Sequence, residues 1–492
     1  MIHREKHDTS AALTHLRKES LDIFNRLHSV AEDINFVDDV CSTYSNLPVM
    51  RKCLTPSARI ITEEPVPANL RCGAWYVDPK LLNHGGAYFK STDGHTNNWS
   101  FNLRRPNLHL LPILIQSRGI VLVDSTRSGK RMPDALSKTV PIWCAVINRA
   151  IKTIHSKDTK WNVALYCPPG VVSGQEHSQI DAQLDTWATS LVQSSYAIPN
   201  MSLPLRPLWI TPSTSSFPRL PTPDKAQFIP VICVSASKQI LEGVERRSQG
   251  FGYVQGSGDD HELWGMGLTP DLFWKNKEQL LSASRGSLPQ LVQTLVASSS
   301  ISLCQEWTEI PTQISKVEGR LLLCPTSYIP MHFPPHVPHS HRPMAYVIIS
   351  NILPALDPPR RDVLALEMQE GKKGQFQFLH SVLFKSIPFI GEHLSKGTAV
   401  CICCHNGKDT SIGVALAALQ IYFDDNGLYV SCMKDQERMR KLADKKSIAT
   451  RLQWIISSRP EANPSRATLK RVNEFLLTPS EFLPLPQSSS KI

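Results

Sequence analysis

One stretch decides the fold of the C-terminal part of this chain: Val400-Cys401-Ile402-Cys403-Cys404-His405-Asn406-Gly407-Lys408-Asp409-Thr410-Ser411. The apolar run Thr398–Cys403 predicts a strand, and the apolar residues between Ser411 and Phe423 predict a helix. In such a strand–loop–helix unit, successive backbone N–H groups point at one spot and the helix N-terminus adds partial positive charge. The stretch therefore predicts a phosphate-binding loop within an α/β fold.

This loop resembles the signature loop of the dual-specificity and tyrosine phosphatases, a cysteine followed by five residues and an arginine. Cys404 aligns with the nucleophile, Gly407 with the loop glycine and Ser411 with the hydroxyl that follows the arginine. The arginine position holds Thr410, and the residue before the cysteine is Cys403 rather than histidine. Because the bidentate guanidinium clamp is absent, we expect hydrolysis through a phosphocysteine to be badly impaired.

Two interpretations of the loop stay open. It can still hold a phosphate, with Lys408 as a point charge that lacks the fork geometry of arginine, or Cys404 is only a buried thiol at a tight turn. Cys401, Cys403 and Cys404 have no second paired set at zinc-finger spacing, so the sequence does not predict a metal site there. Downstream, Arg459–Ser465 and the helical pattern after it resemble the last helices of the phosphatase fold.

A second loop follows a buried strand nearer the N-terminus. The run Gly119–Asp124 predicts a strand that ends in a carboxylate, and Thr126, Arg127 and Lys130 lie in the polar segment after it. This segment loosely resembles the loop with which phosphoribosyltransferases bind phosphoribosyl pyrophosphate, although one acid is present where that loop carries two. Asp124 can contact ribose hydroxyls or a metal ion, while hydroxyl and N–H groups hold phosphate.

Two further segments gather polar groups upstream of this strand. Tyr88–Thr96 contains Lys90, Asp93 and His95 around a turn glycine, and Trp99–His109 places paired arginines beside aromatic residues. Arginines with aromatic neighbours suit phosphates and unstacked RNA bases. An exposed hairpin with a cationic face explains either segment read singly. Together with the loop after Asp124, they favour a functional site.

A third cluster lies in Tyr253–Trp264. Asp259, Asp260, His261 and Glu262 follow two glycines, and the two aspartates can hold Mg²⁺ on a pyrophosphate because hard oxygen ligands suit that ion. The alternative is a solvated acidic turn that caps the next helix.

The remaining pattern predicts two domains in an α/β class. Apolar spacing over Ala11–Ile34 predicts a helix, Asn162–Tyr166 and Phe228–Val234 predict strands, and the dense prolines of Ile198–Pro230 predict an irregular excursion. We expect an N-terminal mixed α/β domain over residues 1–290, a connecting region rich in Pro and His over 291–345, a phosphatase-like α/β domain over 346–480 and a flexible tail over 481–492.

Charge indicates a polyanionic partner. Lys and Arg total 53 against 43 acids in 492 residues, which gives a net charge of +10. Eleven Lys/Arg and four acids lie between Met433 and Arg471, which suits the backbone of a nucleic acid, although a solvated helical face is the ordinary explanation of such a run. The longest apolar runs are too short to span a bilayer, and neither a signal core nor a disulfide framework is visible, so a cytoplasmic protein is expected.

Four stretches in this order resemble the fungal and plant initiator-tRNA ribosylphosphate transferases, and the resemblance covers nearly the whole chain: Phe89–His109, Gly119–Trp143, Tyr253–Trp274 and Cys401–Gly413. It implies transfer of ribose 5-phosphate from phosphoribosyl pyrophosphate to the 2′-hydroxyl of the T-stem adenosine at position 64 of initiator methionyl tRNA. That modification excludes the tRNA from elongation. The implied partner is initiator methionyl tRNA; neither DNA nor a membrane is expected, and the sequence does not name protein partners.

The resemblance also implies a set of site residues. Asp93, His95 and Asp260 are expected to be catalytic, with Asp93 or His95 as the base near the attacking hydroxyl, and Asp259 and Asp260 are expected to hold Mg²⁺. The residues expected to bind phosphate or substrate are Lys90, Arg104, Arg105, Asp124, Thr126, Arg127, Lys130, His261, Cys404, Gly407, Lys408, Asp409 and Ser411. The alternatives are a phosphatase-fold protein that acts on RNA or phosphoprotein, and a tRNA-binding module without catalysis.

Overall fold

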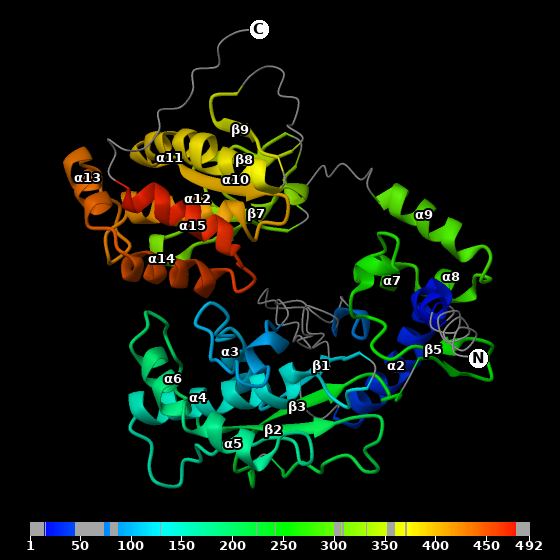
Figure 1. Ribbon diagram of the computed structural model, residues 1–492. Coiled ribbons are helices and arrows are strands. Elements are labelled where there is room, and N and C mark those ends of the chain that lie inside the picture. Colours follow the sequence, from blue (N-terminus) through cyan, green and yellow to red (C-terminus); the bar gives the residue numbers. More distant parts are fainter. Residues whose placement is uncertain are drawn as a thin grey trace, which may run out of the picture. The chain divides into compact units, whose positions relative to one another are not determined.

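The structure is a computed structural model (Figure 1) that describes residues 14, 16–44, 73–78, 87–127, 129–222, 224–241, 243–299, 307, 309–330, 332–351, 360–369 and 371–478. Its elements form two compact units. The first runs from α2 (Ile23–Thr43) to α9 (Leu288–Ser299), and the second from β6 (Thr312–Gln313) to α15 (Arg466–Leu477). Each unit is an α/β structure with a mainly parallel sheet.

The first unit is built on a parallel three-stranded sheet in the order β1 (Ile120–Asp124), β3 (Ile229–Ser235) and β2 (Leu205–Ile210). Every residue of β1 and β3 is buried, as their continuous apolar sequences require in a parallel sheet. Asp124 pairs in register with Ser235, so both strands end at the same edge. Polar loops leave the sheet from this edge.

Helices and short turns complete this unit. Helix α4 (Val140–Ile154) packs on β2 and on α6 (Leu184–Val192) and so covers part of the sheet. Leu27, Val30 and Ile34 of α2 enter a core shared with α7 (Pro270–Lys275), α8 (Lys277–Ser282) and α9. The remaining elements of the unit are listed here in chain order: η2 (Gly73–Trp75), η4 (Ser91–Gly94), α3 (Leu110–Ser117), η5 (Ala135–Thr139), α4 (Val140–Ile154), α5 (Gly174–Asp181), α6 (Leu184–Val192), β4 (Glu245–Arg246), β5 (Gly252–Tyr253), η6 (His261–Leu263), α7 (Pro270–Lys275) and α8 (Lys277–Ser282).

One prediction for this unit is wrong, and another is wrong in part. Asn162–Tyr166 forms no strand, and the Asn162 side chain instead accepts a hydrogen bond from the Ala164 N–H at 2.9 Å, a local turn that competes with strand pairing. The proline-rich stretch 198–230 contains strand β2, whose Pro207 is tolerated because β2 lies at the edge of the sheet.

Other predictions for this unit are confirmed. The strands expected over Gly119–Asp124 and Phe228–Val234 are β1 and β3. In the described residues, α2 begins where the Asp22 side chain accepts from the Asn25 N–H at 3.0 Å, and it continues beyond the predicted end to Thr43. The start of the helix predicted from Ala11 lies outside the described residues.

The second unit contains a five-stranded sheet in the order β6, β7 (Leu321–Pro325), β10 (Ala399–Cys404), β8 (Met344–Ser350) and β9 (Val363–Glu367). All neighbours are parallel except β6, which runs antiparallel to β7. The strand predicted before the phosphatase-like loop is β10, and it occupies the centre of the sheet with all six residues buried.

The helix predicted after the loop is α12 (Thr410–Tyr422), and every residue from Ser411 to Tyr422 is buried. It packs against β10 and several helices, which explains why its sequence is apolar on all sides. The remaining elements of this unit are η7 (Ser315–Val317), η8 (Thr326–Tyr328), α10 (Gly371–Gln377), η9 (Phe378–Leu383), α11 (Phe384–Ser395), α13 (Met433–Lys441) and α14 (Lys445–Ser458).

Two observations bear on the expected organisation. The stretch 291–345, which the sequence suggests is a connecting region, contributes β6 and β7 to the second sheet. Among the described helices, none has both the length and the apolar character needed to cross a bilayer.

Candidate functional site

The loop that follows β1 is anchored at the polar edge of the first sheet. The Asp124 side chain is buried and accepts a hydrogen bond from the Ser125 N–H at 2.9 Å. The Ser125 hydroxyl lies 2.6 Å from the hydroxyl of Ser237, which follows β3. The two strand ends are therefore tied together by side chains rather than by backbone alone.

A buried hydrogen-bond chain extends from these hydroxyls into α2. Ser237 donates to Asp33 Oδ2 at 2.6 Å, and the Tyr253 hydroxyl donates to Asp33 Oδ1 at 2.7 Å. Burial raises the pKa of Asp33 well above its usual range, although the two donors act in the opposite direction. The Asp33 side chain therefore joins α2, β5 and the loop after β3 in one network.

Tyr76 connects the loop after β1 with the loop that contains Asp259. Its hydroxyl donates to Ser125 Oγ at 3.2 Å and accepts from the Gly258 N–H at 2.9 Å. The two loops also touch directly at Gly256, where φ is +68° and an added Cβ would lie 2.4 Å from the Thr126 carbonyl oxygen. Only glycine fits this close approach.

Arg127 brings two of the predicted constellations together. Its Nε donates to Asp259 Oδ2 at 3.1 Å, and its Nη2 pairs with Asp260 Oδ2. Two carboxylates that converge on one guanidinium can also converge on one metal cation, and their hard oxygen ligands fit Mg²⁺. The Arg127 side chain is 59% exposed, so this cluster opens to solvent.

A second guanidinium, Arg26 of α2, faces the same cluster. Burial lowers the pKa of Arg26 to about 10, and its electrostatic neighbours include Tyr76, Arg127 and Asp259. Sequence reasoning missed Arg26 because it lies about a hundred residues before the loop it faces, within a helix whose pattern indicates only packing.

Asp134 connects the loop after β1 with the turn at His95. His95 Nε2 lies 3.7 Å from Asp134 Oδ2, and Lys130 Nζ lies 2.9 Å from the same oxygen. Burial alone would raise the pKa of Asp134, but the hydrogen bonds and charges of Lys130 and Lys138 outweigh it and hold the pKa below its usual range. Asp134 was also missed, because a lone acid in an apolar helix carries no motif.

Asp93 is engaged with a cation. Both of its carboxylate oxygens accept from Arg105 Nη2, at 2.9 and 2.8 Å, and both side chains are 12% exposed. This buried, charge-assisted contact fixes the η4 turn. Two residues were expected as the base. The His95 side chain is half exposed, whereas the Asp93 carboxylate is bound by Arg105, so His95 is the more accessible of the two.

Three other predicted residues border this region. The Lys90 carbonyl accepts from Thr139 Oγ1 at 3.0 Å, and the Arg104 N–H donates to Asn102 Oδ1 at 2.9 Å. The His261 ring lies 5.5 Å from the Trp75 ring, centroid to centroid.

The phosphatase-like loop lies in the second unit. Cys404 Sγ is 3.1 Å from Ser411 Oγ and donates to Asn406 Oδ1 at 3.6 Å. Gly407 has a φ of +61°, and an added Cβ would lie 2.8 Å from the Pro325 nitrogen. Arg459 Nε donates to the Gly407 carbonyl at 3.0 Å and Nη1 donates to Thr312 Oγ1 of β6 at 2.7 Å, which ties the turn to the edge strand.

A pocket of about 320 Å³ opens above this loop, between β8, α10 and the start of α12. The residues that line it are Ile349, Ser350, Asn351, Met368, Gln369, Gln375, Cys404, His405, Asn406, Asp409 and Thr410. Lys408 does not line the pocket, because its Nζ pairs with Glu461 at 3.1 Å. Asp409 does line it, and its Oδ1 accepts a hydrogen bond from the Ser465 N–H at 2.8 Å. The described lining thus has no lysine or arginine, unlike the arginine-containing loop that a phosphatase needs.

Arg127 of the loop after β1 pairs with Asp259 and Asp260. Lys130 of the same loop pairs with Asp134, which also lies near His95. The residues of the phosphatase-like loop belong to the second unit.

Comparisons with solved structures give only weak likenesses. A leucine-rich-repeat and phosphatase-domain protein from Entamoeba histolytica is 15% identical, with a TM-score of 0.22, over 34% of this chain and 91% of that one. Human DUSP28 is 16% identical, with a TM-score of 0.24, over 34% of this chain and 95% of that one. Scores this low add nothing to the fold assignment.

Sequence comparisons are far stronger. Residues 16–297 match the family model of the Rit1 N-terminal domain, and residues 362–476 match that of the Rit1 DUSP-like domain. An uncharacterized protein of Schizosaccharomyces pombe is 33% identical over 92% of this chain and 94% of its own length. The tRNA A64-2′-O-ribosylphosphate transferase of Saccharomyces cerevisiae is 32% identical over 94% of this chain and 93% of its own. The family resemblance inferred from the motifs is thereby confirmed, and the chain belongs to the Rit1 family.

Proposed function

We propose that this protein transfers ribose 5-phosphate from phosphoribosyl pyrophosphate to the 2′-hydroxyl of the T-stem adenosine at position 64 of initiator methionyl tRNA. One observation carries the proposal: the 32% identity to the yeast transferase extends over 94% of this chain and 93% of that protein. A whole-length relationship of this kind covers both units rather than one shared domain.

In the proposed reaction the 2′-oxygen of the tRNA ribose attacks C1 of the donor. The bond between C1 and the pyrophosphate oxygen breaks, pyrophosphate leaves with the electron pair, and the 2′-hydroxyl proton passes to a base. The transition state develops positive charge on the sugar and negative charge on the leaving group, so cations must face the pyrophosphate.

The cluster around Arg127 supplies such cations. Arg127 is exposed and already binds two carboxylates, Arg26 faces the same loops, and Lys130 lies at the other end of the loop after β1. We assign the donor phosphates to these three side chains. Asp124 and Thr126, at the end of β1, are assigned to the ribose hydroxyls and to the phosphate.

Asp259 and Asp260 are the residues that would hold Mg²⁺, which supplies charge neutralisation on the departing pyrophosphate when bound. In the structure Arg127 pairs with the same two carboxylates. Release of Arg127 to the donor phosphates would free both carboxylates for the cation.

His95 is assigned as the base. Its ring is 51% exposed, and Asp134 Oδ2 lies 3.7 Å from Nε2, an arrangement in which a carboxylate can orient the imidazole toward the attacking hydroxyl. Asp93, held by both Nη2 contacts of Arg105, is assigned to fixing the η4 turn that carries His95.

The experiment that tests the proposal incubates the full chain with initiator tRNA, phosphoribosyl pyrophosphate and Mg²⁺. Mass spectrometry of the tRNA should show the addition of one ribose 5-phosphate at the T-stem adenosine. A tRNA with a 2′-O-methyl group at that adenosine should gain nothing. Unchanged tRNA with tight binding would indicate a tRNA-binding module instead, and free phosphate released through Cys404 would indicate a phosphatase.

A matched pair of variants tests the site. Asp260→Asn removes a charge from the Arg127 cluster and should lower transfer by about 10- to 100-fold, the scale on which loss of a group that orients a metal site acts. Glu262→Gln changes an exposed acid two residues away and should transfer as the wild type does. Equal activity of the two variants would refute the assignment of Asp260.

A further inference from the structure

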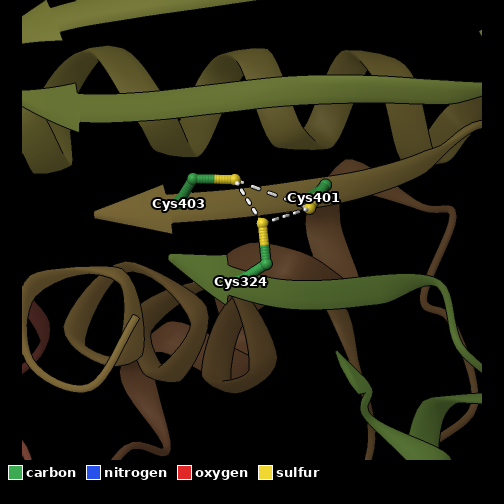
Figure 2. A group of neighbouring side chains, drawn as sticks. All are labelled: Cys324, Cys401 and Cys403. Atoms are coloured by element: carbon green, nitrogen blue, oxygen red, sulfur yellow. Dashed lines mark hydrogen bonds between the residues drawn. The ribbon is translucent and has the colours of Figure 1, made fainter. Parts of the chain in front are cut away.

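A group of three buried cysteines lies beside the phosphatase-like loop but takes no part in its pocket. Cys401 and Cys403 alternate along β10 and so point to the same face of the sheet, and Cys324 of β7 pairs in register with Cys403. Figure 2 shows the three sulfur atoms turned toward one another from these two strands. Cys404 points to the opposite face, where it meets Ser411.

The sulfur atoms form a nearly regular triangle. Cys324 Sγ lies 3.5 Å from Cys403 Sγ and 3.9 Å from Cys401 Sγ, and Cys401 Sγ lies 3.5 Å from Cys403 Sγ. The centre of such a triangle is about 2.1 Å from each sulfur, close to the roughly 2.3 Å of a zinc–thiolate bond. Among the described residues, these three are the group whose potential ligand atoms all lie within 4.8 Å of one another.

We propose that Cys324, Cys401 and Cys403 form a three-thiolate site for a thiophilic d¹⁰ cation, Zn²⁺ or Cu⁺. Thiolates are soft ligands that select these ions over Mg²⁺ and Ca²⁺. The proposal concerns a site separate from the carboxylates of Asp259 and Asp260, which are hard ligands in the other unit.

The electrostatic surroundings favour the thiolate form of Cys324. Hydrogen bonds from Cys401 and Cys403 hold the pKa of Cys324 well below its usual range, and the charge of Arg459 acts in the same direction. The hydrogen bond to Cys324 and burial raise the pKa of Cys401, and burial and the same partner raise that of Cys403, so these two thiols must lose their protons to solvent when a cation binds. Metal affinity should therefore rise with pH.

The shell around the sulfurs is apolar. Leu322, Phe333, Met344 and Tyr346 belong to the same buried cluster, and the three cysteines are at most 1% exposed. A bound cation would be excluded from water and would tie β7 to β10 directly beneath Gly407, whose added Cβ would meet Pro325 and Cys324 backbone atoms. Binding would thus stabilise the folded second unit as well as fill a site.

The test begins with the full chain purified under reducing conditions without chelator from cells grown with added Zn²⁺ or Cu⁺. Elemental analysis should find one equivalent of one of these metals per chain, and the two growth media distinguish which. Cd²⁺ added to chain stripped of metal should produce a thiolate-to-metal charge-transfer band that saturates at one equivalent, together with a rise in Tm.

Variants locate the site. Cys324→Ser and Cys401→Ser should lose the bound equivalent and the charge-transfer band. Cys233→Ser, a buried thiol of β3, and Cys432→Ser, an exposed thiol, should keep both. Since a cluster variant can fail to fold, circular dichroism accompanies each, and the wild-type stoichiometry and Tm shift decide the matter without the variants.

Thiol counting in denaturant separates the alternatives. A metal site predicts three thiols that react more slowly until a chelator is added. Three thiols that react at once in metal-free protein, with no Cd²⁺ band and no Tm shift, would overturn the proposal. Two thiols recovered by reductant but not by chelator would overturn it as well, because they would report a disulfide.

Discussion

At the scale of single residues, Gly256 controls how two loops of the candidate site meet. Gly256→Ala places a Cβ 2.4 Å from the Thr126 carbonyl and adds the strain of a positive φ, so we expect a loss of about 2–5 kcal/mol in the free energy of unfolding. The matched control is Gly250→Ala, which also has a positive φ, +83°, but no atom within 4 Å. It should lose only about 1–2 kcal/mol.

Urea unfolding measures both changes, and transferase assays on the folded fraction measure the effect on the site. Transfer should fall in Gly256→Ala because Thr126 and Arg127 must shift, and should persist in Gly250→Ala. Equal stability and equal transfer in the two variants would show that the close approach at Thr126 does not shape the site.

Asp33 gives a prediction about pH. Burial holds the pKa of Asp33 in the folded chain above that in the unfolded chain, which ionises near pH 4. As pH rises from about 4 toward the folded pKa, the unfolded chain alone releases this proton, so wild type loses up to about 1.4 kcal/mol per pH unit relative to Asp33→Asn.

Urea unfolding of wild type and Asp33→Asn at pH 5 and pH 7 tests this difference. The free energy of unfolding of Asp33→Asn minus that of the wild type should increase from pH 5 to pH 7, whatever its value at pH 5. Parallel pH profiles would mean that Asp33 is ionised in the folded protein.

At the scale of elements, the turn between β10 and α12 depends on its contact with β7. Gly407→Ala brings a Cβ to 2.8 Å from the Pro325 nitrogen, whereas Gly397→Ala, at the turn before β10, has a φ of +75° and no atom within 4 Å. Both share the positive-φ cost, so Gly407→Ala should be less stable by about a further 1–3 kcal/mol. Thermal or urea unfolding decides it; equal losses would contradict the packing described for the turn.

Elements were predictable where their signal is local. The strand and helix around the phosphatase-like loop, β1 and β3 all follow from contiguous apolar runs. Strand β2 was missed because Pro207 indicates irregular structure unless the strand is known to lie at an edge, a fact fixed only by tertiary order.

The site residues were likewise predictable only where they belong to a local motif. Motifs identified Arg127, Asp259 and Asp260, and the structure brings these three together. Sequence reasoning could not find Arg26 or Asp134, because each is isolated in sequence and acquires its neighbours only on folding. The same holds for Cys324, which joins Cys401 and Cys403 only through strand register.

At the scale of the whole molecule, the net charge of +10 predicts salt-sensitive tRNA binding. Of the basic residues between Met433 and Arg471, Arg451 and Arg459 are buried and pair with acids, so their side chains cannot bind the tRNA backbone. In α13, by contrast, Lys434 and Arg438 are exposed.

The double variant Lys434→Ala/Arg438→Ala should weaken tRNA binding and reduce the slope of log affinity against log salt by about 2. Lys396→Ala, an exposed lysine paired with Glu392, is the control and should leave the slope unchanged. Filter binding across a salt series measures both. An unchanged slope in the double variant would place the tRNA backbone elsewhere.

The most direct measurement of the central claim is mass spectrometry of initiator tRNA after incubation with the protein and phosphoribosyl pyrophosphate. We expect one added ribose 5-phosphate on the T-stem adenosine, in the wild type and equally in Cys404→Ser, since the proposed transfer uses no thiol nucleophile. Unmodified tRNA, or a modification that disappears when Cys404 alone is changed, would contradict it.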